Sequence, residues 1–200
     1  LGSILVGLAT PTEAAGVGAT GSLILAALYR RLNLSVLREA SLSTLRTNSL
    51  ILFLAVSSNI YGAVFTRLGT GTMLANWLIG LHVPPLWLLA LVLLVIFILG
   101  WPLEWPAIIF IFVPIFLPVI IALKFDLVWF GTLLAVNLQT AFLSPPVAMA
   151  AYYLKAVAPE WELTDIYSGM MQYMVLQVIA LAIVFFIPQT ALWLPKVLFG

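Results

Sequence analysis

The stretch 137–148, NLQTAFLSPPVA, determines how the surrounding chain folds. It lies inside an apolar run over residues 127–157, which is long enough to cross a bilayer as one helix. Pro145 and Pro146 forbid a continuous helix there, because proline has no backbone N–H and its ring clashes with the preceding turn. The run therefore predicts a broken helix over 127–157, with the break at membrane depth.

The break has a direct consequence for the carbonyls of Ala141 and Phe142. In a helix each would accept a hydrogen bond from the residue four positions later, and both of those residues are prolines. An unpaired carbonyl in lipid costs several kcal/mol, so such a backbone persists only beside protein, water or a ligand. Broken helices at membrane depth are typical of ion sites in transporters. We therefore interpret the rest of the chain as the surroundings of this break.

Three polar side chains lead to the break along one helical face. Asn137, Thr140 and Ser144 are spaced i, i+3 and i+7, so they lie on the same side of a helix. Sodium is a hard cation that takes oxygen ligands, and these side chains together with the freed carbonyls offer several. The alternative is that the line packs against a neighbouring helix through ordinary hydrogen bonds.

The composition places the break in an integral membrane protein. The chain is 64% hydrophobic and 8% charged, and its mean hydropathy is +1.20. It contains no cysteine and one histidine, which excludes disulfides, Cys-ligated zinc and multi-His metal sites. We expect no cofactor and no nucleic-acid partner, with the lipid bilayer as the surrounding medium. The missing initiator Met suggests a piece of a longer protein, its C-terminal part.

Five further segments complete the expected topology. A basic loop with Arg30, Arg31, Arg38 and Arg46 is cytoplasmic by the positive-inside rule. The segments around it and after it are a span over 11–29, the cytoplasmic loop over 30–47, a span over 48–66, an interfacial helix over 73–81 and a span over 165–187.

Polar residues in the first two spans leave two interpretations open. Thr10 and Glu13 are spaced as a capping box at a helix start, although Glu13 could instead be a carboxylate of an ion pathway. The cluster Ser57–Asn59 lies near mid-membrane, where such side chains usually form helix–helix hydrogen bonds and less often line a site.

Residues 86–123 favour a re-entrant hairpin. Two short apolar arms flank the break GWPLEWP, residues 100–106, and 14 apolar residues reach only about 21 Å against a hydrocarbon core of about 30 Å. We expect Gly100 and Glu104 at the hairpin tip, with Glu104 near the protein interior because a carboxylate at depth needs partners. The alternative is two short spans joined by a solvated loop.

The ordered set of motifs resembles one known family. The motifs are TPTEAAGVGA at 10–19, GWPLEWPAIIFIFVPIFLPVI at 100–120 and NLQTAFLSPPVAMAAYYLKAVAP at 137–159. Together they look like the C-terminal half of the large membrane subunit of the tripartite ATP-independent periplasmic (TRAP) transporters. The sequence departs from the family pattern at Ser144, where Thr is common, at Ala148, where Gly is common, and at Trp101-Pro102 in the tip.

The resemblance implies an all-α elevator-type transporter of two inverted repeats, of which this chain would be the second. It implies sodium-coupled uptake of an organic acid, a dicarboxylate or similar carboxylate, with a periplasmic substrate-binding protein and a small membrane subunit as partners. The membrane would be the cytoplasmic (inner) membrane of a bacterium or archaeon. The expected sodium and substrate site comprises Gly100, Glu104, Asn137, Thr140, Ala141, Phe142, Ser144, Pro145 and Pro146.

Two other functional classes can be weighed against this one. A channel or another secondary carrier that works without a binding protein could use the same broken helix. An intramembrane hydrolase would need a base or a ligand set inside the membrane, and the single histidine, His82, lies beside Pro84-Pro85 at an expected interface. The sequence therefore argues against an enzyme.

Overall fold

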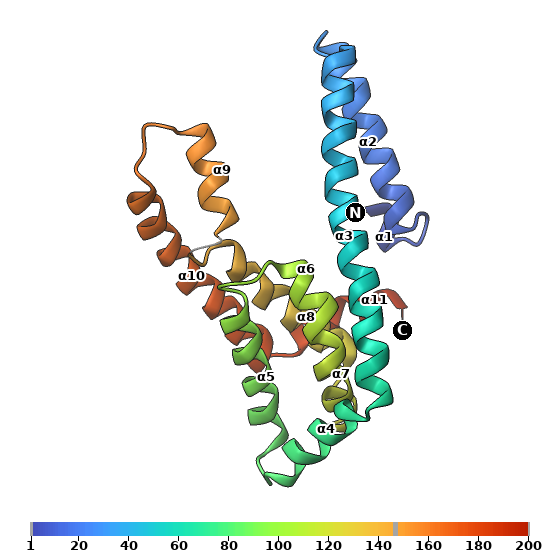
Figure 1. Ribbon diagram of the computed structural model, residues 1–200, viewed down its shortest axis with the longest axis vertical. Helices are drawn as coiled ribbons and strands as arrows, with labels where there is room; N and C mark the ends of the chain where they lie inside the picture. Colours follow the sequence, from blue (N-terminus) through green and yellow to red (C-terminus); the bar gives the residue numbers. More distant parts are fainter. Residues whose placement is uncertain (1, 146–147, 200) are drawn as a thin grey trace. The chain divides into compact units, whose positions relative to one another are not determined.

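A computed structural model of the chain describes residues 2–145 and 148–199 (Figure 1). Every regular element in these residues is helical, which confirms the all-α class. The chain divides into two compact units, Leu1–Leu52 and Phe53–Gly200, and each is described here by itself.

The first unit contains α1 (Gly2–Leu5), α2 (Pro11–Leu28) and the beginning of α3 (Leu34–Arg67). At the start of α2 the Thr10 hydroxyl accepts a hydrogen bond from the Glu13 N–H at 3.3 Å, and the Glu13 carboxylate accepts one from the Thr10 N–H at 2.7 Å. Both halves of the capping box are formed. The capping interpretation of Glu13 is confirmed.

The segment 30–47, predicted as a loop, is mostly helical. Helix α3 begins at Leu34, where the Asn33 side chain accepts a hydrogen bond from the Val36 N–H at 2.8 Å. No proline or glycine occurs between Leu34 and Gly62, so nothing in the sequence stops the helix once it has started. The segment was predicted as a loop because it contains four arginines, although arginine is itself a good helix former. Its cytoplasmic position stays a prediction.

The second unit holds the break and its surroundings. It comprises the rest of α3 and then α4 (Thr70–Gly80), α5 (Pro85–Leu99), α6 (Trp105–Ala107), the π-helix η1 (Ile108–Phe112), α7 (Val113–Ala122), α8 (Leu127–Leu138), the 3₁₀ turn η2 (Gln139–Phe142), α9 (Met149–Val157), α10 (Leu163–Phe186) and α11 (Gln189–Phe199). Helix α11 was not expected as a helix.

Helix α8 lies at the centre of this unit. It contacts α5, α7, α10 and α11 (Figure 1). The main apolar core is built from buried side chains of α5, η1, α7 and α8, among them Leu89, Ile96, Ile108, Ile120 and Leu133. Partly buried residues of α10 and α11 pack against that core. The helix that precedes the break is therefore held on several sides.

Three described helices are long and apolar enough to cross a membrane: Leu34–Phe65, Trp105–Ala122 and Leu163–Phe186. Helix α2, where a span was expected, is not among them, because Glu13 and several small polar residues lower its hydropathy. The second arm of the expected hairpin is among them. The first arm, α5, is a shorter apolar helix and is not among them. The re-entrant hairpin and the alternative of two spans therefore both stay open.

The two arms are joined by residues 100–104, and the second arm begins irregularly. In η1 the Val113 N–H donates to the Ile108 carbonyl, five residues earlier. Pro114 cannot donate to the Phe110 carbonyl, and the buried Ser58 hydroxyl of α3 donates to that carbonyl instead. This confirms the helix–helix interpretation for Ser58.

A second proline shows the same compensation between α8 and α10. Pro188 has no N–H for the Val184 carbonyl, and the indole N–H of the buried Trp129 donates to it at 2.8 Å. An orphaned carbonyl inside the apolar core is thus paired by a donor from the neighbouring helix.

We expect Trp129→Phe to destabilise the protein by about 1–3 kcal/mol, because the aromatic packing is largely kept while the Val184 carbonyl loses its donor. Thermal unfolding of the purified protein in detergent would measure this. Trp161→Phe is the control, since Trp161 is exposed and its indole N–H donates no described hydrogen bond. Equal melting temperatures for the two variants would contradict the role given to the indole N–H.

Candidate functional site

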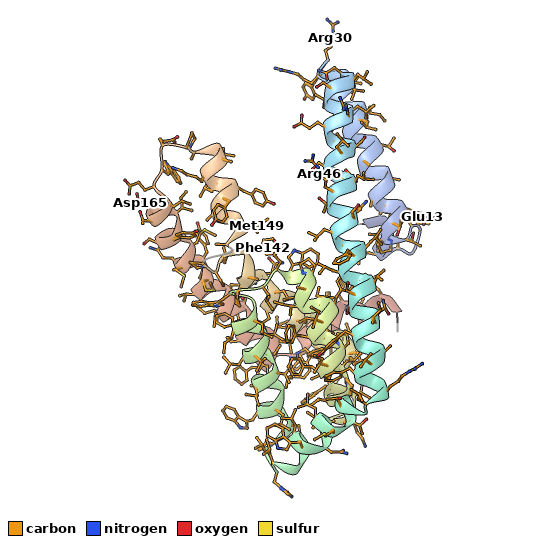
Figure 2. All side chains as sticks on the ribbon, in the orientation of Figure 1. Glu13, Arg30, Arg46, Phe142, Met149 and Asp165 are labelled. Carbon is orange, nitrogen blue, oxygen red and sulfur yellow. The ribbon has the colours of Figure 1, made fainter. Side chains whose placement is uncertain are left out.

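The helix that starts at Leu127 stops being regular well before the prolines. Helix α8 ends at Leu138, the chain tightens into the 3₁₀ turn Gln139–Phe142, and α9 begins at Met149. Figure 2 labels Phe142 and Met149 on the two sides of the break. Pro145 is half-buried in the break, and the predicted site residue Pro146 lies outside the described residues.

The carbonyls of Ala141 and Phe142 are where the sequence predicted them to be available. Within residues 2–145 and 148–199, neither carbonyl accepts a backbone or side-chain hydrogen bond. The carbonyls orphaned by Pro114 and Pro188 differ, because each of those has a side-chain donor from another helix. The backbone at the break is therefore under-satisfied, whereas the Phe110 and Val184 carbonyls are paired.

The predicted polar line exists and is buried. Asn137, Thr140 and Ser144 each expose 1% or less of their surface. The Ser144 hydroxyl donates to the Thr140 carbonyl at 2.7 Å, and the Thr140 hydroxyl donates to the Asn137 carbonyl at 2.7 Å. Both hydroxyl protons are thus used locally, and the lone pairs of both hydroxyl oxygens remain available as acceptors.

Asn137 agrees with both interpretations of the polar side chains at 137, 140 and 144, as helix packing and as an ion site. Its amide nitrogen donates to the Leu93 carbonyl of α5 at 2.8 Å, which is the packing role considered as the alternative. Its amide oxygen Oδ1 is buried and has no hydrogen-bond partner among the described residues. A buried acceptor without a donor costs free energy, so this oxygen is suited to a cation or a water.

The predicted partner of the break, Gly100, lies against it. Gly100 is the buried C-terminal cap of α5, and its N–H donates to the Ile96 carbonyl at 2.9 Å. A Cβ added at Gly100 would lie 3.3 Å from the Ala141 Cβ and 3.3 Å from the Phe97 carbonyl oxygen. The absence of a side chain therefore lets the end of α5 approach the 3₁₀ turn closely.

Glu104 does not join this cluster. It is the N-cap residue of α6, makes no side-chain cap bond and is exposed in this chain. The prediction that Glu104 lies near the protein interior is therefore wrong for the chain as described. Gly100, the C-terminal cap of α5, is buried, whereas four of the five residues from Trp101 to Trp105 are exposed. Among the described residues no group of three acidic or histidine side chains gathers that could hold a metal.

Sequence reasoning missed one polar contact of the site. The Gln177 amide of α10 donates to the Val136 carbonyl at 3.0 Å, one residue before Asn137. A half-buried glutamine in the apolar helix α10 is a signal that could have been used, because such side chains in membranes usually bind another helix.

The arrangement suits a small cation better than an anion. Two helices, α5 and α8, bring their C-terminal ends to the same place, where Gly100 meets Ala141. The C-terminal end of a helix carries a partial negative charge from its unpaired carbonyls. The cluster offers carbonyl, hydroxyl and amide oxygens and contains no cationic side chain, so it resembles the ion sites of transporters with broken helices.

Comparison with known proteins gives a family. Residues 1–190 match the family described as the tripartite ATP-independent periplasmic transporter, DctM component. The chain is 32% identical to the sialic acid TRAP transporter large permease protein of Vibrio cholerae, over 100% of this chain and 47% of the relative. It is 30% identical to the C4-dicarboxylate TRAP transporter large permease protein of Pseudomonas aeruginosa, over 98% of this chain and 46% of the relative.

A third relative is the isethionate TRAP transporter permease protein of Oleidesulfovibrio alaskensis, which is 30% identical over 79% of this chain and 25% of its own length. The chain thus spans about half the length, or less, of these relatives. All three are permeases, which are transport proteins and not enzymes, and several apolar helices agree with a multi-pass membrane protein. The chain belongs to the DctM component family of the tripartite ATP-independent periplasmic transporters.

Proposed function

We propose that this chain is part of a TRAP transporter that couples sodium entry to the uptake of an organic acid. The substrate would be a dicarboxylate or similar carboxylate, because two of the relatives above are named for sialic acid and for C4-dicarboxylates. A periplasmic binding protein would deliver it, and a small membrane subunit would complete the transporter in the bacterial inner membrane. The chain would form one of two inverted repeats that move by an elevator mechanism.

The observation that carries the sodium proposal is the pair of carbonyls at Ala141 and Phe142. They accept no hydrogen bond among the described residues, and they precede the buried Ser144 by three and two residues in the sequence. Sodium would supply the missing partner, since unwound carbonyls and the C-terminal ends of half-helices coordinate sodium in transporters. Asn137 Oδ1 adds a further acceptor without a donor on the same helix.

The contact between Gly100 and Ala141 suggests how sodium would be coupled to transport. The end of α5 contacts the 3₁₀ turn through Gly100 and Ala141, so both elements could contribute to the proposed site. A cation held between them would stabilise their contact, and a site without sodium would be looser. If substrate binding requires the ordered arrangement, sodium and substrate strengthen each other's binding by the same factor.

We expect Ser144→Ala to weaken the sodium dependence of uptake. The variant loses a hydroxyl ligand while the small buried side chain keeps its place, and we expect about tenfold more sodium for half-maximal uptake. The measurement is uptake into proteoliposomes that contain the complete transporter and its binding protein, over a range of sodium concentrations. Ser168→Ala, at an exposed position of α10, is the control.

An unchanged sodium curve for correctly inserted Ser144→Ala would count against the proposed site. Uptake that needs no binding protein would instead favour the other carrier class, in which the broken helix works without a delivered substrate.

A further inference from the structure

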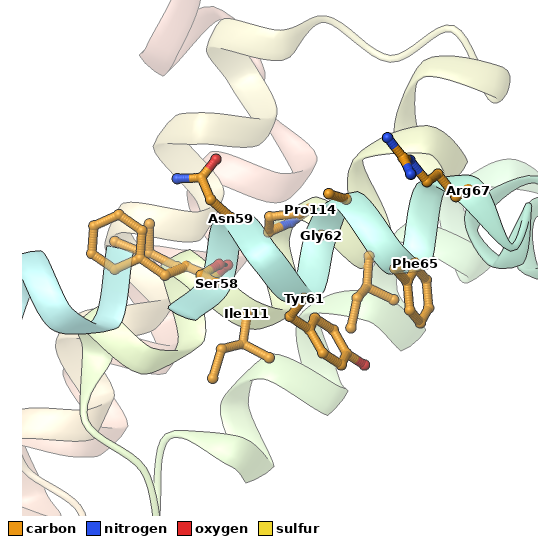
Figure 3. Close-up of a pocket in the computed structure, with 12 residues that line it drawn as sticks. Ser58, Asn59, Tyr61, Gly62, Phe65, Arg67, Ile111 and Pro114 are labelled. Atoms are coloured by element: carbon orange, nitrogen blue, oxygen red, sulfur yellow. Dashed lines mark hydrogen bonds between the residues drawn. The ribbon is translucent and has the colours of Figure 1, made fainter. Parts of the chain in front are cut away.

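A pocket of about 630 Å³ lies beside α3, away from the residues proposed to hold sodium (Figure 3). One wall is the last turns of α3, from Ser58 to Arg67, and the other is η1 with the start of α7. All of its lining residues belong to the unit Phe53–Gly200. None of them takes part in the function proposed above.

The pocket exists because α3 carries small residues where it faces the second arm. Gly62 and Ala63 line it, opposite Pro114. A Cβ added at Gly62 would meet no atom within 4 Å, so the space above this glycine is open. Larger side chains at these two positions would fill the hollow.

The pocket has polar residues at both ends and apolar residues between them. Asn59, Ala63 and Arg67 are spaced by four residues and share one face of α3, with Arg67 at its C-terminal end. Figure 3 shows Arg67 at one end of the labelled residues and Ser58 and Asn59 at the other. Between them the opposite wall is formed by isoleucines of η1 and α7.

Neither polar group at the Ser58 end requires a ligand. The Ser58 hydroxyl donates to the Phe110 carbonyl, and the Asn59 amide donates to the Ala55 carbonyl of its own helix at 3.0 Å. Arg67 differs, because it is exposed and has no ion-pair or hydrogen-bond partner among the described residues. An occupant would therefore place a negative charge at Arg67 and an apolar part along the rest.

The height of Arg67 relative to the membrane fits such an occupant. The apolar span of α3 ends at Phe65, two residues before Arg67. Tyr61 and Phe65 stack with ring centroids 5.6 Å apart in the last turns of the span, where aromatic side chains commonly mark the interface. Arg67 thus lies at the level of lipid headgroups, and about 13 Å of helix separates it from Ser58 in the apolar region.

We propose that this pocket binds an anionic phospholipid, with the phosphate at Arg67 and an acyl chain over Gly62 and Ala63. Charge complementarity selects the anionic headgroup, since basic pockets between membrane helices bind such headgroups. The isoleucine wall and the open space above Gly62 accept the chain. The lipid holds α3 against the arm that contains η1, where the Ser58 hydroxyl also bonds the Phe110 carbonyl.

The test uses the complete transporter with its small membrane subunit, purified in mild detergent and analysed by native mass spectrometry. Phosphatidylglycerol and phosphatidylcholine are added in equal amounts. We expect selective retention of phosphatidylglycerol, about fivefold weaker in Arg67→Gln and lost in Gly62→Leu. Two controls keep selective retention: Arg46→Gln, a charge change on α3 outside the pocket, and Gly131→Leu, an open glycine on α8.

The thermal unfolding of the same samples gives a second measurement. Phosphatidylglycerol should raise the melting temperature of the wild-type transporter and of both controls, but not that of Gly62→Leu. Equal retention of the two lipids by the wild type would overturn the proposal, as would undiminished retention in both pocket variants. Equal retention would mean that Arg67 selects no headgroup, and undiminished retention in both variants would mean that the lipid binds elsewhere on the transporter. Sodium-dependent uptake is measured separately and does not enter this test.

Discussion

Pro145→Ala is expected to reduce uptake at limiting sodium by about tenfold or more, with the transporter still inserted and folded. Alanine restores a backbone N–H at position 145, four residues after Ala141, so the 3₁₀ turn can extend as a regular helix. That N–H would take the Ala141 carbonyl away from the ion, and the loss of about 1.4 kcal/mol of sodium binding is a tenfold change. The variant gains local helix stability and loses function.

Pro188→Ala is the matched control for this experiment. It also restores an N–H toward an orphaned carbonyl, that of Val184, but Trp129 already donates to that carbonyl. Sodium-dependent uptake by Pro188→Ala should therefore follow the wild-type curve. If Pro145→Ala does so as well, the break is a packing kink, and the ion site assigned to it must be withdrawn.

Gly100→Val is expected to raise the sodium concentration for half-maximal uptake by about tenfold. A Cβ at Gly100 would already lie 3.3 Å from the Ala141 Cβ, and the two methyl groups of valine would push the end of α5 away from the 3₁₀ turn. The same proteoliposome assay measures the effect. A wild-type sodium curve would show that the close approach of α5 has no role in binding.

A double-mutant cycle separates this contact from general damage. Gly100→Ala should weaken sodium dependence less than valine does, and adding Ala141→Gly should recover part of the loss because it removes the opposing Cβ. Recovery should be incomplete, since the Phe97 carbonyl lies equally close to the new Cβ. Additive losses would contradict a direct contact between the two positions.

The sequence predicted those features whose interacting groups lie close together along the chain. The Thr10–Glu13 capping box is contained in four residues, and the chain is interrupted between Phe142 and Met149, where the sequence places two prolines. Hydropathy alone placed the chain in a membrane. The burial of Asn137, Thr140 and Ser144 also agrees with their shared helical face.

Features that depend on residues far apart in the sequence could not be predicted from local patterns. The sequence does not show that Trp129 pairs the Val184 carbonyl, 55 residues away, or that Asn137 reaches Leu93 on α5. The exposure of Glu104 depends on the direction of the chain after Gly100, and a carboxylate between two tryptophans gives no sign of that direction. The extension of α3 over 34–47 was missed because charge was taken as a sign of a loop.

The π-helical segment Ile108–Phe112 also sets the rotation of the helix that follows it. A π turn takes up about one residue more than an α turn, so side chains beyond it are rotated by about 100° relative to an uninterrupted helix. Deleting any one residue of this segment would rotate α7 relative to the chain before it, while leaving the composition almost unchanged. Among relatives, a one-residue difference in length here would therefore change which face of α7 meets α4, even where every neighbouring residue is identical.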